Sequence, residues 1–427
     1  MGRDGRPSGE WMRQVVCGTL MACGRQVFSL GMVPTPTVQL FAEQEGIAGG
    51  ISISASHNPA EWNGMKFFNG RGLYLNAEEN AAFWRIVDAQ TFHTADYTAL
   101  GSIVDKGDPD AQHIGTILKL PVFQQNHHLE AMRRRRLRVV VDAVHASGSY
   151  VVPKLLEALG CEVIPLYCDG TGIFPHTPEP LPEHLTALSH SVREHRADAG
   201  IAVDPDADRL VLVDEDGNTV REEYTIALAT LAVLKNAQYF APQFDQQATP
   251  STQATVVINL STTRTVEDIA AQYNARVLRT PVGEINVVNA MLAHGAVIGG
   301  EGSGGVILPS CHAGRDALVG SALLVLLLAQ SEMTLAECVA SLPQYAMVKH
   351  KYPLNGNLHD TFDKVRALFP QASVNTDDGL RLQFGRELGN AWLHLRSSNT
   401  EPIIRIIAES PSEAQAQELC EKCSTAL

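Results

Sequence analysis

The chain has 427 residues, of which 45% are apolar and 19% charged, and its formal net charge is −14. This length allows two to four domains with apolar cores, and the composition is that of a globular protein. No apolar run reaches the roughly 18 residues that a membrane span requires, and the first residues lack the apolar core of a signal peptide. We therefore expect a cytoplasmic protein without a membrane partner, and the negative charge argues against a nucleic-acid partner.

Apolar β-branched runs alternate with helical patterns along most of the chain, which predicts βαβ units and mainly parallel sheets. The first predicted helix has Ser8 as its expected N-cap. Its apolar residues recur at helical spacing: Trp11, Met12, Val15, Val16 and Cys23. The pattern therefore predicts an α/β fold from the first residues onward.

The next segment predicts a hydroxyl on an exposed turn. Apolar residues alternate from Ile51 to Ala55 as in a strand, and Pro59 ends the strand. Ser56 and His57 therefore fall at the carboxyl end of the strand, where open α/β sheets bind ligands. A Ser-His pair on a turn is more often structural than catalytic, so this segment alone leaves both interpretations open.

A second α/β unit is expected in the middle of the chain. It contains strands at 137–142, 162–166 and 199–203 and a helix near 150–159. The basic run 133–136 stands immediately before the first of these strands. It favours a solvated connector between domains over a nucleic-acid patch.

An acidic loop follows the last strand of this unit. Asp204, Asp206 and Asp208 alternate there, and such carboxylates can converge on a hard cation such as Mg²⁺. The spacing also fits the start of an EF-hand, with Glu215 at its last position, but Arg209 stands where that loop needs Gly. An acidic turn without a metal is the remaining alternative.

A third unit is expected from strands at 254–259 and 296–299, after a Gln-rich separator at 243–253. Its glycine loop, 299–305, contains G-x-G-x-x-G, but no helix pattern follows, so a dinucleotide site is not expected. Glu301 and Ser303 on this loop could hydrogen-bond sugar hydroxyls. A flexible hairpin explains the glycines equally well.

Beyond Val348 the pattern changes to shorter strands at 380–383 and 391–395 and a terminal helix. The loop 396–402, followed by Arg405, combines guanidinium, hydroxyl and amide groups and predicts a phosphate clamp rather than a solvated polar turn. Eight cysteines without a repeated framework suit a reducing compartment. Cys420 and Cys423 are expected as helix-surface thiols.

Four loops of the chain, in order and at similar spacing, resemble those of the α-D-phosphohexomutases, the family of phosphoglucomutase, phosphomannomutase and phosphoglucosamine mutase. The loops are A-S-H-N-P at 55–59, D-P-D-A-D-R at 204–209, G-E-G-S-G-G at 300–305 and R-S-S-N-T-E-P at 396–402. Shorter matches occur at Gly2-Arg3-Asp4, Pro34-Thr35-Pro36, Asn63-Gly64-Met65-Lys66 and Thr280-Pro281-Val282-Gly283. The resemblance extends over the whole chain.

The resemblance implies a role for each loop. It implies that Ser56 carries a phosphoryl group and that His57, Lys66 and Arg209 support its transfer. The implied ligands of Mg²⁺ are Ser56, Asp204, Asp206 and Asp208. The implied substrate-binding residues are Glu301, Ser303, Arg396, Ser397, Ser398, Asn399, Thr400 and Arg405.

The resemblance also implies three mixed-sheet α/β domains and a smaller C-terminal α+β domain around a central cleft. We expect a phosphoserine-loop domain at 1–125, a metal-binding domain at 126–240, a sugar-binding domain at 241–345 and a phosphate-binding domain at 346–427. Family members normally carry an F-G-T-S/D-G-I-R-G-like segment ahead of the motif that begins here at Gly2. We therefore expect that the first strands of domain one are absent, or that the start codon is wrongly chosen, and that the sheet holding Ser56 loses a neighbour.

The implied reaction moves phosphate between C6 and C1 of a hexose, with a hexose 1,6-bisphosphate as intermediate and activator. The loop at 300–305 together with H-A-G-R-D-A at 312–317 looks most like phosphoglucosamine mutases. Phosphomannomutase or phosphoglucomutase activity is the alternative, as is a catalytically impaired homologue that only binds sugar phosphates. The expected partner is a small sugar phosphate, bound by a monomer or a homodimer.

Overall fold

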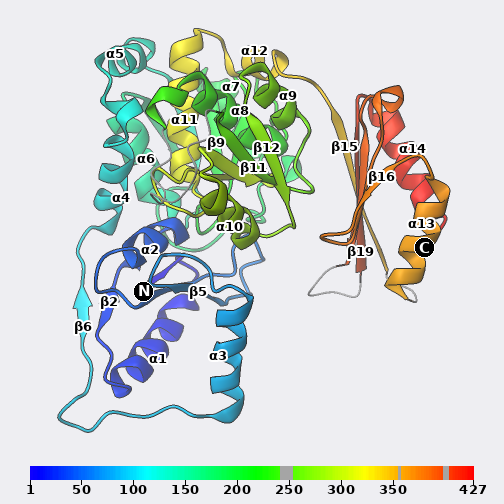
Figure 1. Cartoon of the computed structure of the whole chain (residues 1–427). Helices are drawn as coiled ribbons and strands as arrows, with labels where there is room; N and C mark the ends of the chain where they lie inside the picture. The colour runs from blue at the N-terminus through cyan, green and yellow to red at the C-terminus, as the bar shows by residue number, and fades with distance from the viewer. Residues whose placement is uncertain (241–252, 354–356, 398–402) are drawn as a thin grey trace.

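The computed structural model describes residues 1–240, 253–353, 357–397 and 403–427. Four sheets follow one another along the chain, with helices packed between and around them (Figure 1). The first three sheets are mixed and four-stranded, and the C-terminal sheet is five-stranded and antiparallel. Within the described residues, no helix is long and apolar enough to cross a membrane.

The N-terminal sheet has the order β3-β1-β4-β5, in which only β5 is antiparallel to its neighbour. Its elements are β1 (Gly2–Arg3), α1 (Gly9–Ala22), β3 (Gly31–Met32), α2 (Thr35–Ala42), β4 (Gly49–Ile53), β5 (Met65–Asn69) and α3 (Ala77–Ala89). Strand β4 is paired on both sides, with β1 contributing Gly2 and Arg3. The expected N-cap Ser8 precedes α1, but its hydroxyl accepts a hydrogen bond from Asn63 instead of capping the helix. Trp11 and Val15 of α1 are exposed.

The next two sheets repeat this plan, with orders β10-β9-β7-β8 and β12-β11-β13-β14. The second sheet and its helices comprise β7 (Arg138–Asp142), α6 (Gly148–Ala158), β8 (Glu162–Leu166), η2 (Pro182–His184), α7 (Thr186–His195), β9 (Ala199–Val203), β10 (Leu210–Val213), α8 (Glu223–Lys235) and η3 (Ala237–Tyr239). The third comprises β11 (Thr255–Asn259), α9 (Thr265–Gln272), β12 (Arg276–Thr280), α10 (Glu284–His294), β13 (Ile298–Glu301), β14 (Gly305–Ile307), α11 (Ala317–Ser331) and α12 (Leu335–Ala340). The predicted strands of both units are confirmed, and the Gln-rich separator lies largely outside the described residues.

One apolar core joins the second and third sheets. Helix α11, which reads Ala-Leu-Val-Gly-Ser-Ala-Leu-Leu-Val-Leu-Leu-Leu-Ala, is apolar around its whole circumference and is buried between them. Such a helix is stable only where other elements cover every side of it. It packs against α5, α6 and α8, so residues from 117 to 342 contribute to a single core.

The segment that links the first two sheets is helical. It contains β6 (Ile103–Asp105), which pairs with β2 (Val27–Ser29), followed by α4 (Pro109–Leu118), η1 (Pro121–Gln124) and α5 (Asn126–Arg135). The basic run 133–136, expected as a solvated connector between domains, lies in this linking segment and forms the last turn and the C-cap of α5, with Arg133, Arg134 and Arg136 exposed. Cationic side chains in the last turn interact favourably with the negative end of the helix dipole, which accounts for this placement.

The C-terminal region is an antiparallel sheet of order β15-β19-β18-β17-β16, covered by two helices. Its elements are β15 (Ala346–Pro353), α13 (Leu358–Leu368), β16 (Ser373–Asn375), β17 (Leu380–Gln383), η4 (Arg386–Leu388), β18 (Trp392–Ser397), β19 (Ile403–Ser410) and α14 (Glu413–Ser424). The prediction of helix-surface thiols is wrong, because Cys420 and Cys423 are fully buried against the sheet. Together with Ala416 and Leu419 they form the apolar stripe of α14.

Candidate active site

Three of the four loops that sequence analysis singled out occupy equivalent places in the three α/β sheets. The serine loop connects β4 to β5, the acidic loop connects β9 to β10, and the glycine loop connects β13 to β14. In each sheet this is the turn from a parallel strand into the antiparallel edge strand. The repeated plan therefore presents a serine, a carboxylate cluster and a glycine turn in the same structural position.

Ser56 lies directly beside the acidic loop. Its Oγ donates a hydrogen bond to Asp204 Oδ2 at 3.1 Å and lies 3.2 Å from His57 Nδ1. The backbone of Ser56 has a φ of 52°, a left-handed conformation that a non-glycine residue adopts only when its surroundings enforce it. Residues 148 positions apart in the sequence therefore meet at one hydroxyl.

Arg6 enforces that conformation of the serine loop. Its side chain is fully buried, and its guanidinium donates to the carbonyl oxygens of Ser56 (2.5 Å), Asn58 (2.8 Å), Pro59 (2.7 Å) and Trp62 (3.1 Å). Its Nε pairs with Asp4 at 2.9 Å. One side chain thus satisfies four carbonyl groups of a single loop, which fixes the loop as a rigid unit.

The three aspartates of the acidic loop are buried, and their ligand atoms lie within 4.8 Å of one another. Each carboxylate has one oxygen held by hydrogen-bond donors from the backbone or from other side chains. Asp204 Oδ1 accepts two backbone N–H groups, Asp206 Oδ2 accepts from Thr35 and Lys66, and Asp208 Oδ2 accepts from Lys66 and Arg315. The other oxygens of Asp206 and Asp208 have no hydrogen-bond partner although they are buried.

These unpartnered oxygens fit a metal ion. A buried carboxylate oxygen without a partner is costly, and a hard divalent cation coordinated by oxygen ligands removes that cost. Burial and the neighbouring Asp208 and Asp206 raise the pKa of Asp204, so the site is short of positive charge. The formal charges of the site also leave room for a cation. Its five carboxylates belong to Asp204, Asp206, Asp208, Glu284 and Glu301, and its three positive side chains are Lys66, Arg209 and Arg315. The difference is two negative charges, which one divalent ion would balance.

The residues around Ser56 differ in their protonation. Burial, reinforced by Arg209, lowers the pKa of His57 to about 3, so its ring is neutral. Burial also lowers the pKa of Lys66, but Asp206 and Asp208 outweigh it and hold that pKa well above its usual value. His57 therefore has a ring nitrogen free to accept a proton, whereas Lys66 provides a fixed positive charge.

The glycine loop is joined to the acidic loop through Arg315. Glu301 Oε2 accepts from Arg315 Nη1 at 2.8 Å, and Arg315 Nη2 donates to Asp208 Oδ2 at 2.7 Å. Glu301 Oε1 accepts from Asn259 and from the backbone N–H of Gly283. Ser303 lies at the turn between β13 and β14 and is partly exposed.

The C-terminal loop is linked to the others less directly. Arg396 and Arg405 are opposite each other on β18 and β19, and the Nε of each lacks a hydrogen-bond partner. Arg396 Nε lies 3.3 Å from Asp378 Oδ2, which accepts the backbone N–H of Val282 at 2.9 Å. Ser397 ends β18, whereas Ser398, Asn399 and Thr400 lie outside the described residues.

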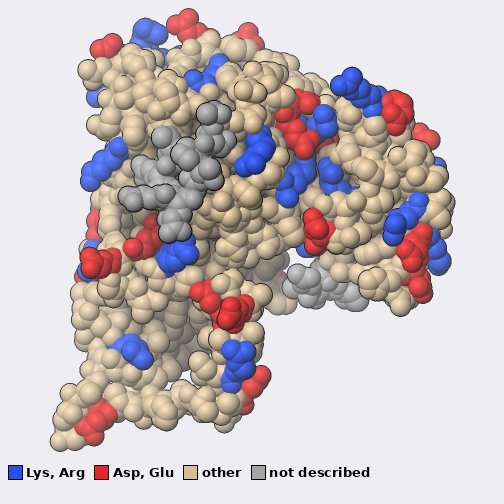
Figure 2. Space-filling model, viewed as in Figure 1, with Lys and Arg blue, Asp and Glu red and all other residues tan. Residues whose placement is uncertain are grey.

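The molecule is hollowed between its N-terminal part, which carries α3, and its C-terminal part, which carries β19 (Figures 1 and 2). Strand β19 (Ile403–Ser410) lies beside this hollow in Figure 1. Acidic and basic side chains are mixed along the junction of the C-terminal part with the rest, where Lys349 pairs with Glu222 and Glu223 (Figure 2).

Comparison with known proteins settles the family. Models of the phosphoglucomutase/phosphomannomutase family match the chain in order: alpha/beta/alpha domain I at 1–94, domain II at 120–217, domain III at 231–345 and the C-terminal domain at 351–426. The chain belongs to this family. The family expected from the sequence, the α-D-phosphohexomutases, is thereby confirmed.

Relatives of the chain are named as mutases. A phosphoglucomutase/phosphomannomutase of Thermococcus kodakarensis is 34% identical, with 99% of this chain and 88% of the relative covered. A "probable phosphoglucosamine mutase" of Methanopyrus kandleri is 32% identical, with 98% and 87% covered. The crystal structure of a phosphoglucomutase/phosphomannomutase family protein of Burkholderia thailandensis superposes with a TM-score of 0.82 at 28% identity, covering 100% of this chain and 88% of that one. The chain is therefore a phosphohexomutase, an enzyme of the isomerase class.

Sequence analysis missed two residues that organise this phosphohexomutase site. Arg6 belongs to the G-R-D-G-R-P-S-G segment, and Arg315 belongs to H-A-G-R-D-A, but neither was selected as a site residue. The four carbonyl groups that Arg6 binds lie 50 or more positions away, and the partners of Arg315 lie up to 107 positions away, so local pattern could not reveal these contacts.

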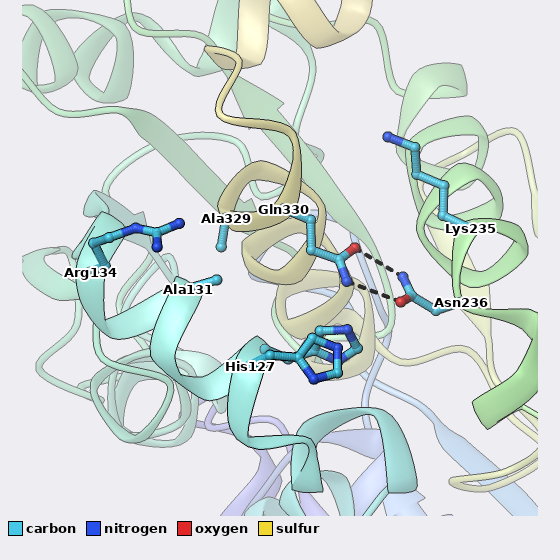
Figure 3. Close-up of a pocket in the computed structure, with 8 residues that line it drawn as sticks. His127, Ala131, Arg134, Lys235, Asn236, Ala329 and Gln330 are labelled. Carbon is cyan, nitrogen blue, oxygen red and sulfur yellow. Dashed lines mark hydrogen bonds between the residues drawn. The ribbon is translucent and has the colours of Figure 1, made fainter.

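A separate pocket of about 470 Å³ lies between α5, α8 and α11 (Figure 3). Its lining includes His127, Arg134 and Lys235, and the side-chain amides of Asn236 and Gln330 pair reciprocally at 3.0 Å. None of the residues that line it belongs to the four loops. It is therefore not part of the mutase site.

Proposed function

We propose that the chain interconverts glucosamine 6-phosphate and glucosamine 1-phosphate through a phosphorylated Ser56 and a hexose 1,6-bisphosphate intermediate. The observation that carries the proposal is the placement of Ser56 Oγ, 3.1 Å from Asp204 Oδ2 and beside carboxylate oxygens that have no other partner. Phosphoryl transfer depends mainly on positioning and on charge stabilisation, and this arrangement supports both.

In each transfer, the bond between phosphorus and Ser56 Oγ breaks and a bond from phosphorus to the free hydroxyl oxygen of the sugar forms. The hydroxyl proton passes to a basic group, and neutral His57, with Nδ1 3.2 Å from Ser56 Oγ, is the candidate. A loose transition state needs little help from a strong base, so a weakly basic imidazole is sufficient. In the second transfer, the bond between phosphorus and the other ester oxygen of the bisphosphate breaks and a bond from that phosphorus to Ser56 Oγ forms. The proton taken up in the first transfer passes to the freed sugar oxygen, and phosphorylated Ser56 is restored.

Positive charge at the site stabilises the transferring group. Asp204, Asp206 and Asp208 would hold Mg²⁺, which neutralises charge on the phosphoryl oxygens when bound. Lys66 and Arg209 add fixed charge, and Arg396 with Arg405 would hold the phosphate that does not react. Glu301 and Ser303 would contact the sugar.

The preference for glucosamine phosphate is supported by the relative of Methanopyrus kandleri that is named a probable phosphoglucosamine mutase, at 32% identity. We also place the enzyme in the cytoplasm, since its eight cysteines are all free.

The test is a steady-state mutase assay with glucosamine, mannose and glucose phosphates, each with its 1,6-bisphosphate as activator. We expect the highest kcat/KM for glucosamine phosphate and a requirement for Mg²⁺. A preference for mannose or glucose phosphate would reassign the substrate. Absence of turnover with all three, in protein shown by intact mass to carry phosphoserine, would contradict the proposed function.

A further inference from the structure

Arg315 occupies the point at which three elements of the protein meet. Its Nε donates to Glu284 Oε2 at the start of α10 (3.0 Å), its Nη1 to Glu301 Oε2 in the glycine loop (2.8 Å) and its Nη2 to Asp208 Oδ2 in the acidic loop (2.7 Å). The side chain of Arg315 is 12% exposed, and its three partners are buried. Each donor edge of the guanidinium therefore serves a different carboxylate.

The contact with Asp208 determines which of its oxygens is available. Arg315 and Lys66 both donate to Oδ2, and Oδ1 has no partner. Groups that hold the outer atoms of a metal ligand fix its orientation. Arg315 thus turns Oδ1 of Asp208 toward the other aspartates and, through Glu301, fixes the side chain that faces the sugar.

The position of Arg315 is itself prepared by its neighbours. The residue pairs with Ile307 beside β14, and its stem passes over Gly305, where a Cβ atom would lie 2.4 Å from Arg315 Cδ. The next residue, Asp316, is fully buried, caps α11 and accepts hydrogen bonds from His113 (2.8 Å) and His312 (3.1 Å). The backbone at Arg315 is therefore held by its pairing with Ile307 and, through Asp316, by the start of α11 and by the two histidines.

We propose that Arg315 is a positioning residue that aligns the metal-binding loop with the sugar-binding loop, so that metal affinity and sugar affinity both depend on the shape of its guanidinium. The inference rests on the proposed function for the identity of the sugar, but not for the effect on the metal. Lysine at this position would keep the charge but not the planar, three-sided donor set. The substitution R315K therefore separates geometry from charge.

The experiment compares the native chain with R315K and with a matched control, R279K. Arg279 is equally buried, pairs with Glu267 at 2.8 Å and donates to the backbone carbonyls of Asn259 and Thr262, none of which lies in the serine, acidic or glycine loop. Mg²⁺ is titrated calorimetrically into each protein, KM for glucosamine 6-phosphate is measured, and thermal unfolding reports stability. We expect R315K to weaken Mg²⁺ binding by about tenfold and to raise KM several-fold, and R279K to change both by less than about twofold.

Native Mg²⁺ affinity in R315K would overturn the inference, because charge alone would then suffice. Equal losses in R315K and R279K that follow their loss of thermal stability would also overturn it, because the role would be structural. If the native chain turns over no hexose phosphate but R315K still loses Mg²⁺ affinity while R279K does not, the proposed function fails and the alignment of the metal loop by Arg315 stands.

Discussion

The three loops of the α/β sheets and the loop of the C-terminal sheet are held in different ways. The serine and acidic loops are joined by the hydrogen bond from Ser56 to Asp204 and by Lys66, and the acidic and glycine loops are joined by Arg315. The C-terminal sheet has a core of its own, separate from the core that unites the second and third sheets. Its arginines reach the rest of the site through Asp378 and one backbone N–H group.

This difference assigns the reaction chemistry to the loops of the α/β sheets and substrate binding to the C-terminal sheet. Groups that stabilise a transition state must be fixed before the substrate arrives, and the buried loops meet that requirement. In the proposed function, the arginines of the C-terminal sheet would bind phosphate in two orientations of the sugar, and a sheet with a core of its own would suit that role. The comparison predicts that changes in the α/β sheets reduce kcat, whereas changes in the C-terminal sheet raise KM.

The strongest test of the prediction for the α/β sheets is Ser56→Ala. Removing the proposed phosphoryl carrier should lower kcat by at least roughly 10⁴-fold, because the proposed mechanism transfers the phosphoryl group through Ser56 alone. Stability should change little, since Ser56 lies on a partly exposed turn and not in the core. Mutase assays, intact mass and circular dichroism check these points, and substantial turnover by the variant would remove Ser56 from the mechanism.

Asp206→Asn tests the metal site. An amide in place of one of three anionic ligands should lower kcat by roughly 10³-fold at a fixed Mg²⁺ concentration, and added Mg²⁺ should restore part of it. Sugar phosphate binding should change less. EDTA treatment of the native enzyme is the companion measurement, and full activity after it would show that the carboxylates act without a metal.

Leu393→Ala tests whether the C-terminal core is independent. Leu393 of β18 is fully buried in that core, and its truncation should cost about 3 kcal/mol of unfolding free energy. Calorimetry should show a lower transition temperature for one unfolding step while the step of the α/β sheets is unchanged. A single unfolding transition whose temperature falls as a whole would show that the regions fold as one unit, and it would contradict the comparison.

Arg6→Ala tests the rigidity of the serine loop. Loss of the four carbonyl contacts should lower kcat by about 10²-fold, the scale of a reacting group displaced by about 1 Å, with little change in KM. Added guanidinium ion should recover part of the loss, and Arg6→Lys should recover less. If the fall in kcat follows the loss of folded protein, and guanidinium ion does not restore activity, Arg6 has only a structural role.

Arg396→Ala should have the smallest effect, about 2 kcal/mol or roughly 30-fold in KM, because its guanidinium is partly exposed. The rate at saturating substrate should stay within a few-fold of the native rate. Measurement of KM and kcat in both reaction directions checks this, and a loss confined to kcat would place Arg396 among the chemical groups.

Much of this organisation could be predicted from the sequence, because strand ends followed by polar residues are local signals. The strands before Ser56 and Asp204 were located correctly by alternation and by apolar runs, whereas the strand expected at 296–299 lies at Ile298–Glu301 and contains Glu301. What could not be predicted was their common position at the turn into an antiparallel edge strand, since pairing direction is a property of the sheet. The domain boundaries at 125, 240 and 345 stay a prediction.

The errors have physical reasons as well. Ser8 lost its capping role because Asn63, 55 positions away, provided a donor for its hydroxyl. The thiols of Cys420 and Cys423 were misplaced because the C-x-x-C pair was considered as a motif, although its spacing from Ala416 and Leu419 is that of a buried helix face. Arg6 and Arg315 act on partners that only the fold brings near.

The close passage of Arg315 over Gly305 has a consequence for the evolution of these proteins. A single added methyl group at position 305 would occupy the space of the arginine stem. Arginine at position 315 therefore requires glycine at position 305, whereas glycine at position 305 does not require arginine at position 315. Across related chains we expect glycine at position 305 wherever arginine occupies position 315.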